Sequence, residues 1–462
     1  LTGGWETAAL FRSWRADLPL LAETSGKNAI IVTPSADLDL AVADVVRSAF
    51  GHAGQKCSAA SLVILVGSVA RSERLSRQLE DAVRTLRVGY PQQASAQMGP
   101  LIEPPSGKLL GALTVLGDGE QWLVAPRSLD ESGRLWSPGV RTGVAAGSEF
   151  HLTEYFGPVL GVMTAATLDD AIALQNAVAY GLTAGIHSLE PREVAHWLDR
   201  VEAGNLYVNR GITGAIVRRQ PFGGWKRSTV GTGAKAGGPN YVLTLGSWRS
   251  VEREPSGNIL VDGLSRRVAS VVKRGQSGIS FEEFDRVRRG ALSDEAAWAS
   301  EFGLSRDVSA LEVERNVFRY RPAAVTIRLS EGEPLGHLVR LIAAGSLAGA
   351  ELTISSAQPL PTALVESFSE PIPTANVRAI VIETDAAWLA RAPQLTGRVR
   401  LVGGDPLALA TAVGGNPDVA IYSAPVTTEG RVELLPFLRE QSVSITAHRF
   451  GNPDRAMAGL TV

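Results

Sequence analysis

Apolar and polar positions in the first half of the chain follow two alternating periodicities. Short apolar runs, typical of buried strands, are followed by segments in which apolar residues recur every three or four positions, as on one face of a helix. Repeated strand and helix units predict an α/β fold with a largely parallel sheet covered by helices. The predicted strands are 28–32, 61–66, 159–164, 184–188 and 205–209, and the predicted helices are 37–49, 68–86, 168–180 and 191–202.

The pattern changes after residue 245 and then returns. Residues 246–315 are richer in charge and less periodic, so we expect a linker with short helices there. From residue 320 the alternation of strands and helices resumes, which predicts a second α/β domain. Its predicted strands are 323–329, 351–355, 377–382 and 399–402, with a helix over 334–347.

Composition excludes several classes of protein. The chain has 462 residues with 45 basic and 47 acidic side chains, a formal charge of −2, so it has no electrostatic footprint for nucleic acid or an anionic membrane. No apolar run approaches the roughly 18 residues that span a bilayer. We expect an ordinary globular protein of the cytoplasm.

Cys57 is the single cysteine of the chain. A lone thiol forms no internal disulfide and no four-cysteine metal site, so it is either a small buried hydrophobe or a nucleophile, and composition alone favours the first. Glycines break the helix before Cys57 and a strand follows, which places the thiol on a turn. Glu23 precedes the strand 28–32, and a carboxylate there could meet the thiol at one end of the sheet.

Two other features are weaker candidates. The glycine-rich stretch 221–239 is no phosphate-binding loop, because neither Lys226 nor Lys235 has the glycine spacing and the following Ser or Thr of that motif. It is therefore a surface loop or a substrate loop. The six histidines show no metal-ligand spacing, so we expect surface or packing roles and no metal site.

Four motifs, in this order, carry a resemblance to a known family. They are Glu-x-x-Gly-Lys at 23–27, Gly-Gln-Lys-Cys at 54–57, Glu-Tyr-Phe-Gly-Pro-Val at 154–159 and Pro-Phe-Gly-Gly at 221–224. Together they resemble the aldehyde dehydrogenase superfamily. The resemblance implies that Cys57 attacks an aldehyde, that the thiohemiacetal passes a hydride to NAD, and that Glu23 activates the water that hydrolyses the resulting thioester.

The same resemblance implies further site residues. Glu154 and Phe156 match positions that contact the nicotinamide side of the cofactor, and the Thr2-Gly3 turn matches part of its binding domain. Phe222 matches an aromatic side chain of the aldehyde channel. Considered singly, Glu154 could be a solvated loop carboxylate and Phe222 a core residue.

The loop before Pro221 narrows the range of possible substrates. Gly214-Ala215 is similar to the anchor loop of 1-pyrroline-5-carboxylate dehydrogenases, where backbone amides would hold a carboxylate, and Ser58 would add a hydroxyl donor. The expected reaction is therefore NAD-dependent oxidation of glutamate semialdehyde. The alternatives are an aldehyde dehydrogenase for an uncharged aldehyde and a scaffold without activity, in which Cys57 is buried.

The second half resembles the C-terminal extension of long proline utilisation A proteins, through Tyr320-Arg321-Pro322 and residues 441–452. In that family a proline dehydrogenase domain with FAD precedes the aldehyde dehydrogenase, and the extension covers a tunnel. We therefore expect part of a bifunctional, homo-oligomeric enzyme of proline catabolism, inactive alone because most of the cofactor domain lies upstream of Leu1.

A weak similarity between residues 420–446 and 1–23 also predicts that the last domain is a degenerate, non-catalytic nucleotide-binding repeat. The expected domains are 1–27, a remnant of the dinucleotide-binding domain; 28–248, catalytic; 249–315, linker; and 316–462, the non-catalytic α/β domain.

Overall fold

The computed structural model describes residues 1–248, 251, 254 and 259–462. Contacts within the chain divide it into two units, each assembled from separate stretches of sequence. The large-sheet unit comprises Glu23–Ser228, Arg306–Phe318 and Gln441–Val462. The small-sheet unit comprises Leu1–Ala22, Thr229–Ser305 and Arg319–Glu440. These divisions differ from the expected domain boundaries.

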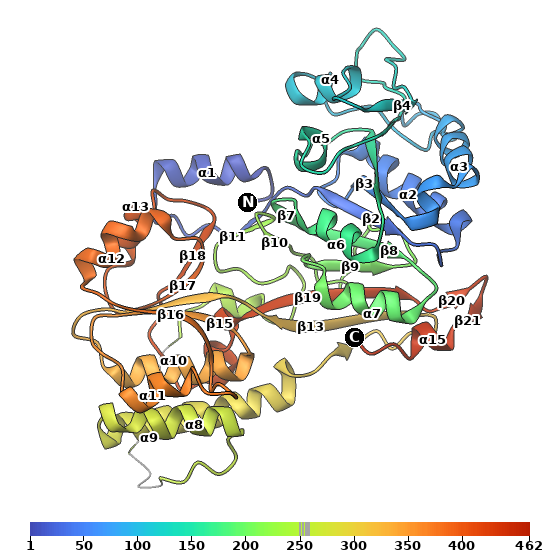
Figure 1. Ribbon diagram of the computed structural model, residues 1–462. Coiled ribbons are helices and arrows are strands. Elements are labelled where there is room, and N and C mark those ends of the chain that lie inside the picture. Colours follow the sequence, from blue (N-terminus) through green and yellow to red (C-terminus); the bar gives the residue numbers. More distant parts are fainter. Residues whose placement is uncertain (249–250, 252–253, 255–258) are drawn as a thin grey trace. The chain divides into compact units, whose positions relative to one another are not determined.

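A ten-stranded sheet forms the centre of the large-sheet unit (Figure 1). Its central strands pair in parallel, as the alternation of strands and helices predicts, and antiparallel pairs occur at both edges. In spatial order the strands are β12 (Arg306–Asp307), β13 (Glu314–Pro322), β19 (Leu438–Thr446), β9 (Asn205–Val208), β8 (Thr183–His187), β2 (Asn28–Val32), β3 (Ala60–Val66), β6 (Val159–Ala165), β5 (Gly139–Thr142) and β4 (Gln121–Val124).

Strand β2 shows why both faces of this sheet are covered. Successive side chains of a strand point to opposite faces. Ala29 and Ile31 belong to one core cluster, and Ile30 and Val32 belong to another. The first cluster includes buried residues of α6 (Leu168–Asn176) and α7 (Pro191–Arg200), and the second includes those of α2 (Leu38–Phe50) and α3 (Glu73–Arg84).

Local capping sets the ends of the predicted helices. Asp37 caps α2 by accepting a hydrogen bond from the amide of Leu40, and Ser72 caps α3 by accepting one from Leu75. Helix α3 is therefore shorter than the predicted 68–86. Shorter elements complete the unit: α4 (Gly107–Thr114), α5 (Glu149–Leu152), α15 (Arg455–Ala458), the antiparallel pair β7 (Tyr180–Gly181) and β10 (Trp225–Lys226), and the pair β20 (His448–Arg449) and β21 (Asn452–Pro453).

The small-sheet unit contains a five-stranded parallel sheet. Its spatial order is β16 (Asn376–Ile382), β15 (Glu351–Ser356), β14 (Val325–Leu329), β17 (Gly397–Val402) and β18 (Val419–Tyr422). Counted along the chain this is the order 3-2-1-4-5, which is typical of doubly wound nucleotide-binding folds. The prediction of a second, nucleotide-binding-like α/β fold is confirmed. Its helices are α1 (Trp5–Trp14), α8 (Arg266–Gly275), α9 (Phe281–Ala297), α10 (Leu335–Ala348), α11 (Thr362–Ser367), α12 (Asp385–Arg391), α13 (Pro406–Ala412) and α14 (Gly430–Glu433).

Residues 259–305 differ from the linker that the sequence predicts over 249–315. Of the first ten residues of that linker, the structure describes only 251 and 254. Helices α8 and α9 bury Val268, Val271, Phe284 and Val287 in the core of the small-sheet unit. The apolar positions of these helices are hard to recognise in the sequence, because buried charged residues lie among them. Asp285 is fully buried and accepts hydrogen bonds from two arginines of α9. Buried charges of this kind are tolerated only when they are paired.

The end of the chain also differs from the predicted 316–462 domain. Strand β19 pairs in parallel with β9, with Ser444 opposite Tyr207. Residues 441–462 therefore belong to the large-sheet unit, and so does 306–318. The repeat that the similarity of 420–446 to 1–23 suggests would set Asn28 against Asn452. The structure does not support this alignment, since Asn28 begins the buried strand β2 and Asn452 begins the exposed strand β21.

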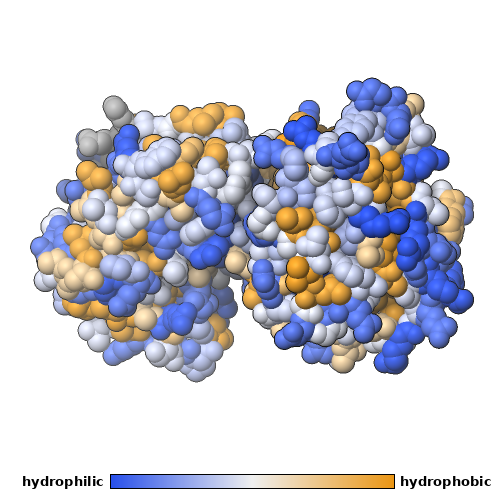
Figure 2. Space-filling view, turned by 90° about the horizontal axis from the view of Figure 1, so that it is seen from above, coloured by the Kyte–Doolittle hydropathy of each residue, from blue (hydrophilic) through white to orange (hydrophobic). Residues whose placement is uncertain are grey.

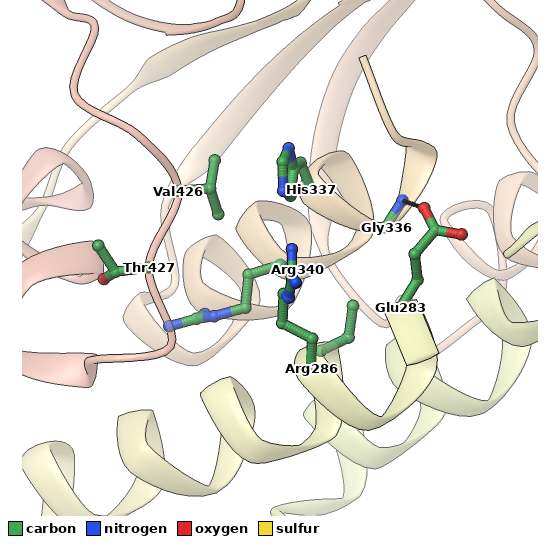
Figure 3. A pocket seen from close by; sticks show the side chains of 8 residues that line it. Glu283, Arg286, Gly336, His337, Arg340, Val426 and Thr427 are labelled. Carbon is green, nitrogen blue, oxygen red and sulfur yellow. Dashed lines mark hydrogen bonds between the residues drawn. The ribbon is translucent and has the colours of Figure 1, made fainter. Parts of the chain in front are cut away.

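A small pocket lies between α9, α10 and the segment at Val426 and Thr427 (Figure 3). Glu283 of α9 accepts a hydrogen bond from the amide of Gly336, in the first turn of α10. In a doubly wound fold, the N-terminus of the helix that follows the first strand binds phosphate. Here a carboxylate of the chain itself accepts from that amide. Beside it, Arg340 makes two hydrogen bonds of 2.5 and 2.7 Å to Asp294.

On the face shown in Figure 2, hydrophobic residues form small areas separated by hydrophilic ones. None of the helices in the described ranges combines the length and the apolar character needed to cross a membrane.

Candidate active site

Cys57 lies on the predicted turn, between a short 3-10 segment at Gly51–Gly54 and strand β3. Three consecutive residues, His52, Ala53 and Gly54, have positive φ angles, which turn the chain sharply after α2. The turn leaves the thiol half-buried at the end of the sheet where strand β3 begins. The position on a turn is therefore confirmed, and a fully buried packing role does not describe this side chain.

Two glycines bring neighbouring segments against this turn. A Cβ atom on Gly26 would stand 2.5 Å from the carbonyl oxygen of Cys57, and one on Gly54 would overlap the carbonyl of Gly157. Asn28 fixes the turn further, because its side-chain amide donates hydrogen bonds to the carbonyls of Cys57 and Ala59 at 2.7 and 2.9 Å. Segments 23–28, 51–59 and 154–159 therefore meet at one place.

Glu154 is part of this meeting point. Its Oε1 accepts a hydrogen bond of 2.9 Å from the amide of Gly26. Burial raises the pKa of Glu154, while the bond from Gly26 and the nearby charges of Lys108 and Lys27 oppose the rise. A half-buried carboxylate with one oxygen fixed by a backbone amide is not the solvated loop residue of the alternative interpretation.

Glu23 is the second carboxylate close to the thiol. Strand β1 (Ala22–Glu23) carries it, and the amide of the next residue, Thr24, donates to the carbonyl of Ser228 at 3.1 Å. Burial, followed by the negative charges of Glu154 and Glu23, raises the pKa of the Cys57 thiol. The structure thus places the thiol and both predicted carboxylates within electrostatic reach of one another.

An open pocket lies beside these groups. Gly26, Gly54 and Gly157 line it together with Glu154 and Phe156. The ring of Phe156 is 39% exposed, on a backbone with a positive φ of 57°. This wall provides a flat aromatic surface beside a hydrogen-bond acceptor.

The predicted substrate residues lie in the same unit as Cys57. Ser58 is buried, and its carbonyl accepts a hydrogen bond from Thr183. Phe222 is half-buried, after Pro221, whose carbonyl accepts hydrogen bonds from Asn205 and Ser442. Gly214 and Ala215 are exposed in the loop that follows β9. Thr2 and Gly3 belong to the small-sheet unit, and their cofactor role stays a prediction.

Two residues near the site were not anticipated from the sequence. Lys27, which is buried, has its Nζ 4.2 Å from the centre of the Phe150 ring, and burial lowers its pKa to about 7. Tyr207 of β9 is buried close enough to Cys57 for the charge of the thiolate to act on its phenol, whose pKa burial raises to about 12. The motif Glu-x-x-Gly-Lys could have pointed to Lys27. Nothing in the apolar sequence of β9 indicates that Tyr207 lies near the thiol.

The histidines show no ligand cluster. Across the described residues, no group of three or more His, Cys, Asp or Glu side chains is arranged to hold a metal ion.

Comparison with known proteins now decides the family. The aldehyde dehydrogenase family matches residues 1–251, which is more than half of the chain. The chain belongs to the aldehyde dehydrogenase family. The resemblance carried by the four motifs is therefore confirmed.

Individual members of the family are similar over part of their length. The 1-pyrroline-5-carboxylate dehydrogenases of Geobacillus sp. (strain WCH70) and Bacillus subtilis (strain 168) are 37% and 36% identical over 225 residues, 48% of this chain and 43% of each relative. The structure of proline utilization A from Corynebacterium freiburgense is 47% identical with a TM-score of 0.81, over 98% of this chain and 42% of that one. The chain thus spans less than half the length of these relatives.

Proposed function

We propose that this chain supplies the thiol and the general base of an NAD-dependent dehydrogenase that oxidises glutamate semialdehyde to glutamate. One observation carries the proposal: the half-buried thiol of Cys57 lies within the electrostatic influence of Glu23, on a turn at the end of the sheet. The similarity to 1-pyrroline-5-carboxylate dehydrogenases over the same residues supports the choice of substrate.

The chemistry follows from the environment of the thiol. Because the pKa of Cys57 is raised, the thiol keeps its proton at neutral pH and needs a base when its sulfur attacks the aldehyde carbon. Glu23 accepts that proton and releases it to solvent before the thioester is hydrolysed. After oxidation the acyl group is held as a thioester on Cys57, and Glu23 takes a proton from the water that attacks it. Glutamate leaves and the thiol is restored.

The pocket beside Cys57 fits the nicotinamide end of NAD. Glu154 offers an acceptor to ribose hydroxyl groups, and Phe156 offers an aromatic face to a flat ring. When bound, NAD accepts the hydride that the aldehyde carbon loses. Cys57 holds that carbon in place during the transfer.

The loop that contains Gly214 supports a substrate with a carboxylate at the end away from the aldehyde. Gly214 has a positive φ of 82°, and a Cβ atom there would meet nothing within 4 Å. Amides on such an open turn are accessible to an anion. An uncharged aldehyde would gain nothing from this arrangement.

The wider assembly belongs to the same proposal. Similarity to proline utilization A over 98% of the chain supports a place in a bifunctional polypeptide that also carries an FAD-dependent proline dehydrogenase and forms a homo-oligomer. In that polypeptide the small-sheet unit has no catalytic role, which the carboxylate of Glu283 at the first turn of α10 supports.

Kinetics with two aldehydes test this function. In the native polypeptide that contains these residues, we expect kcat/KM for glutamate semialdehyde to exceed that for propanal, and C57S to abolish both activities. Equal values for the two aldehydes would favour a dehydrogenase for uncharged substrates. No NAD reduction by the wild type, together with protection of Cys57 from alkylation, would favour the scaffold.

A further inference from the structure

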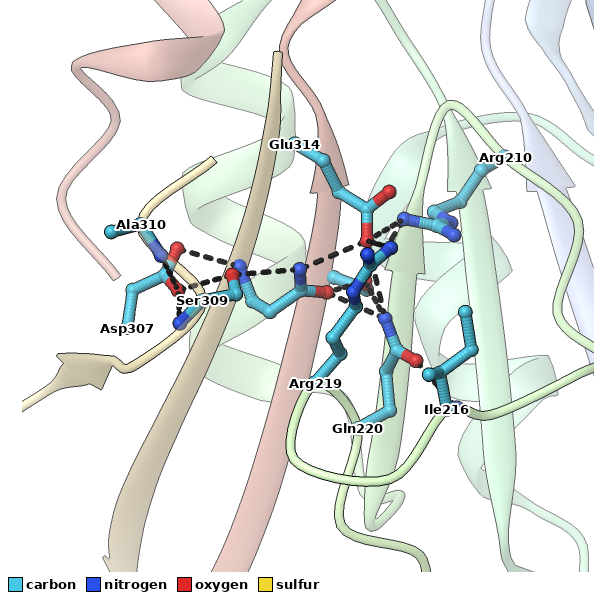
Figure 4. A network of polar contacts seen from close by, with 10 residues as sticks. Arg210, Ile216, Arg219, Gln220, Asp307, Ser309, Ala310 and Glu314 are labelled. Carbon is cyan, nitrogen blue, oxygen red and sulfur yellow. Dashed lines mark hydrogen bonds and ion pairs between the residues drawn. The ribbon is translucent and has the colours of Figure 1, made fainter. Parts of the chain in front are cut away.

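We infer that Glu314, Asn316 and Ser444 are positioning residues that fix the loop 210–220 and thereby set the affinity for the carboxylate end of the substrate. The inference rests on the proposed function, since that loop is the proposed carboxylate anchor. With Arg210, Arg219 and Gln220 these side chains form what we call the loop network (Figure 4).

The strand that carries Ser444 explains its direction. Strand β19 lies next to β9 in parallel, and β9 leads directly into Arg210. Along β19, Val443 and Ile445 join the hydrophobic core, so Ser444 faces the opposite side of the sheet. Its hydroxyl is completely buried. A buried hydroxyl is stable only with hydrogen-bond partners, and two of the partners here, Arg210 and Gln220, belong to the loop.

The start of the loop is held by two members of the network. Nη1 of Arg210 donates to Oγ of Ser444 at 3.1 Å and lies 3.1 Å from Oε1 of Glu314. Two residues later, the amide of Ile212 donates to Oγ of Ser48 in α2. This end of the loop is thus attached on both sides.

The other end of the loop is held by the same side chains. Nε2 of Gln220 donates to Oδ1 of Asn316 at 2.5 Å and to Oγ of Ser444 at 2.8 Å. Oε1 of Gln220 accepts from the amide of Ile216 at 2.8 Å, so the connection reaches inside the loop. Ser444 in turn donates to Asn316 at 2.5 Å. Its hydroxyl therefore uses one donor and two acceptor positions, the full capacity of the group.

Charge adds to this attachment. Oε1 of Glu314 lies 3.1 Å from Arg210 and 3.9 Å from Arg219, so one carboxylate pairs with both ends of the loop. Partial burial acts to raise the pKa of Glu314, but the hydrogen bond from Asn316 and the two arginines lower it below its ordinary value. Glu314 therefore stays ionised at neutral pH.

The middle of the loop depends on these ends. Gly214, Ala215, Ile216 and Val217 are all exposed, and Val217 reaches 79%. Amides in such a segment hold a fixed direction only when the flanking residues are fixed, and preorganisation of this kind raises affinity for a ligand. Asn316 is itself fixed, since its backbone amide donates to Oδ2 of Asp307 at 2.8 Å.

The variants S444A and E314Q test the inference in the native polypeptide. Each removes one functional group of the network and leaves its volume nearly unchanged. The matched control is T446A, because Thr446 lies two residues further on the same side of β19 and its hydroxyl has no hydrogen bond to any described residue. Two readouts are used: hydrogen exchange of the amides of residues 211–219, and KM for glutamate semialdehyde and for propanal.

We expect S444A and E314Q to speed exchange in the loop and to raise KM for glutamate semialdehyde at least about tenfold. KM for propanal and kcat for both aldehydes should stay within about twofold of the wild type, as should all values for T446A. Unchanged exchange in the loop, or an equal rise in KM for both aldehydes, would overturn the inference. If the wild type does not prefer the carboxylated aldehyde, the proposed function fails, and hydrogen exchange alone then decides whether the network fixes the loop.

Discussion

The carbonyl oxygen of Cys57 lies 2.5 Å from the position that a Cβ atom would take on Gly26. The same carbonyl accepts a hydrogen bond from Asn28, and the amide of Gly26 donates to Glu154. One residue without a side chain thus allows the thiol turn and the carboxylate of Glu154 to approach each other.

The variant G26A should therefore displace the turn of Cys57. We expect a loss of about 1–3 kcal/mol in the free energy of unfolding, because the nearest obstacle to the new methyl group is a backbone oxygen and not the end of a flexible side chain. Dehydrogenase activity should fall more than about tenfold, since small displacements of reacting groups are costly. G111A in α4 is the matched control, because a Cβ atom there meets nothing within 4 Å. Urea unfolding and steady-state kinetics measure both effects, and a G26A protein as stable and active as G111A would contradict the argument.

The variant E23Q separates two roles of one carboxylate. Glu23 helps to raise the pKa of Cys57, so its neutralisation should lower that pKa and speed alkylation of the thiol by iodoacetamide at neutral pH. Turnover of the aldehyde should nevertheless fall about 100-fold or more, because no base remains for the attacking water. E80Q, in an exposed ion pair with Arg84, is the control and should change neither rate. Unchanged alkylation in E23Q would show that Glu23 does not act on the thiol, and slower alkylation would show that its action as a base outweighs the effect of its charge.

Lys27 should make stability depend on pH in a specific direction. Burial lowers its folded pKa to about 7, below the ordinary value of 10.5. Between these values the unfolded chain binds a proton that the folded chain lacks, so the free energy of unfolding rises with pH, by at most about 1.4 kcal/mol per unit. Relative to K27M, the wild type should gain stability from pH 7 to pH 10 and gain nothing below pH 7. Urea unfolding of both proteins at several pH values measures the difference, and parallel curves would refute the assignment to Lys27.

The ion pair of Arg340 and Asp294 should dominate the stability of the small-sheet unit. Both side chains are at most 2% exposed, so R340L would leave a buried carboxylate without its partner. We expect a loss of about 3–5 kcal/mol in the free energy of unfolding. R378Q removes a comparable pair with Glu351 that is exposed, and should cost less than about 1 kcal/mol. Equal losses in the two variants, measured by chemical denaturation, would show that burial of the pair is unimportant.

Local patterns predicted the elements that are regular over their whole length. Strands β2 and β6 and helix α7 lie where the apolar spacing placed them, because the periods of strand and helix are properties of adjacent residues. The turn of Cys57 was predicted for the same reason, since glycines after α2 prevent the helix from continuing.

The sequence missed what depends on distant partners. Helix α9 reads as charged, yet Asp285 and Asp294 are buried in ion pairs whose other members can lie far along the chain, as Arg340 does. Alternating hydroxyls at Ser442 and Ser444 within an apolar strand were a signal of buried polar contacts. They did not identify the partners, because hydrogen bonds between strands are not encoded in the periodicity of either strand.

By itself, the sequence determined the family and the α/β architecture and named Cys57, Glu23 and Glu154 as candidates for the site, because short motifs and local periodicity can be recognised without knowledge of contacts. Only the tertiary structure decided that the last residues of the chain complete the large sheet and reach the loop of Gly214 through Ser444. The physical reason is that strand pairing selects a partner by burial and hydrogen bonding across space, and more than 200 residues separate Arg210 from Ser444.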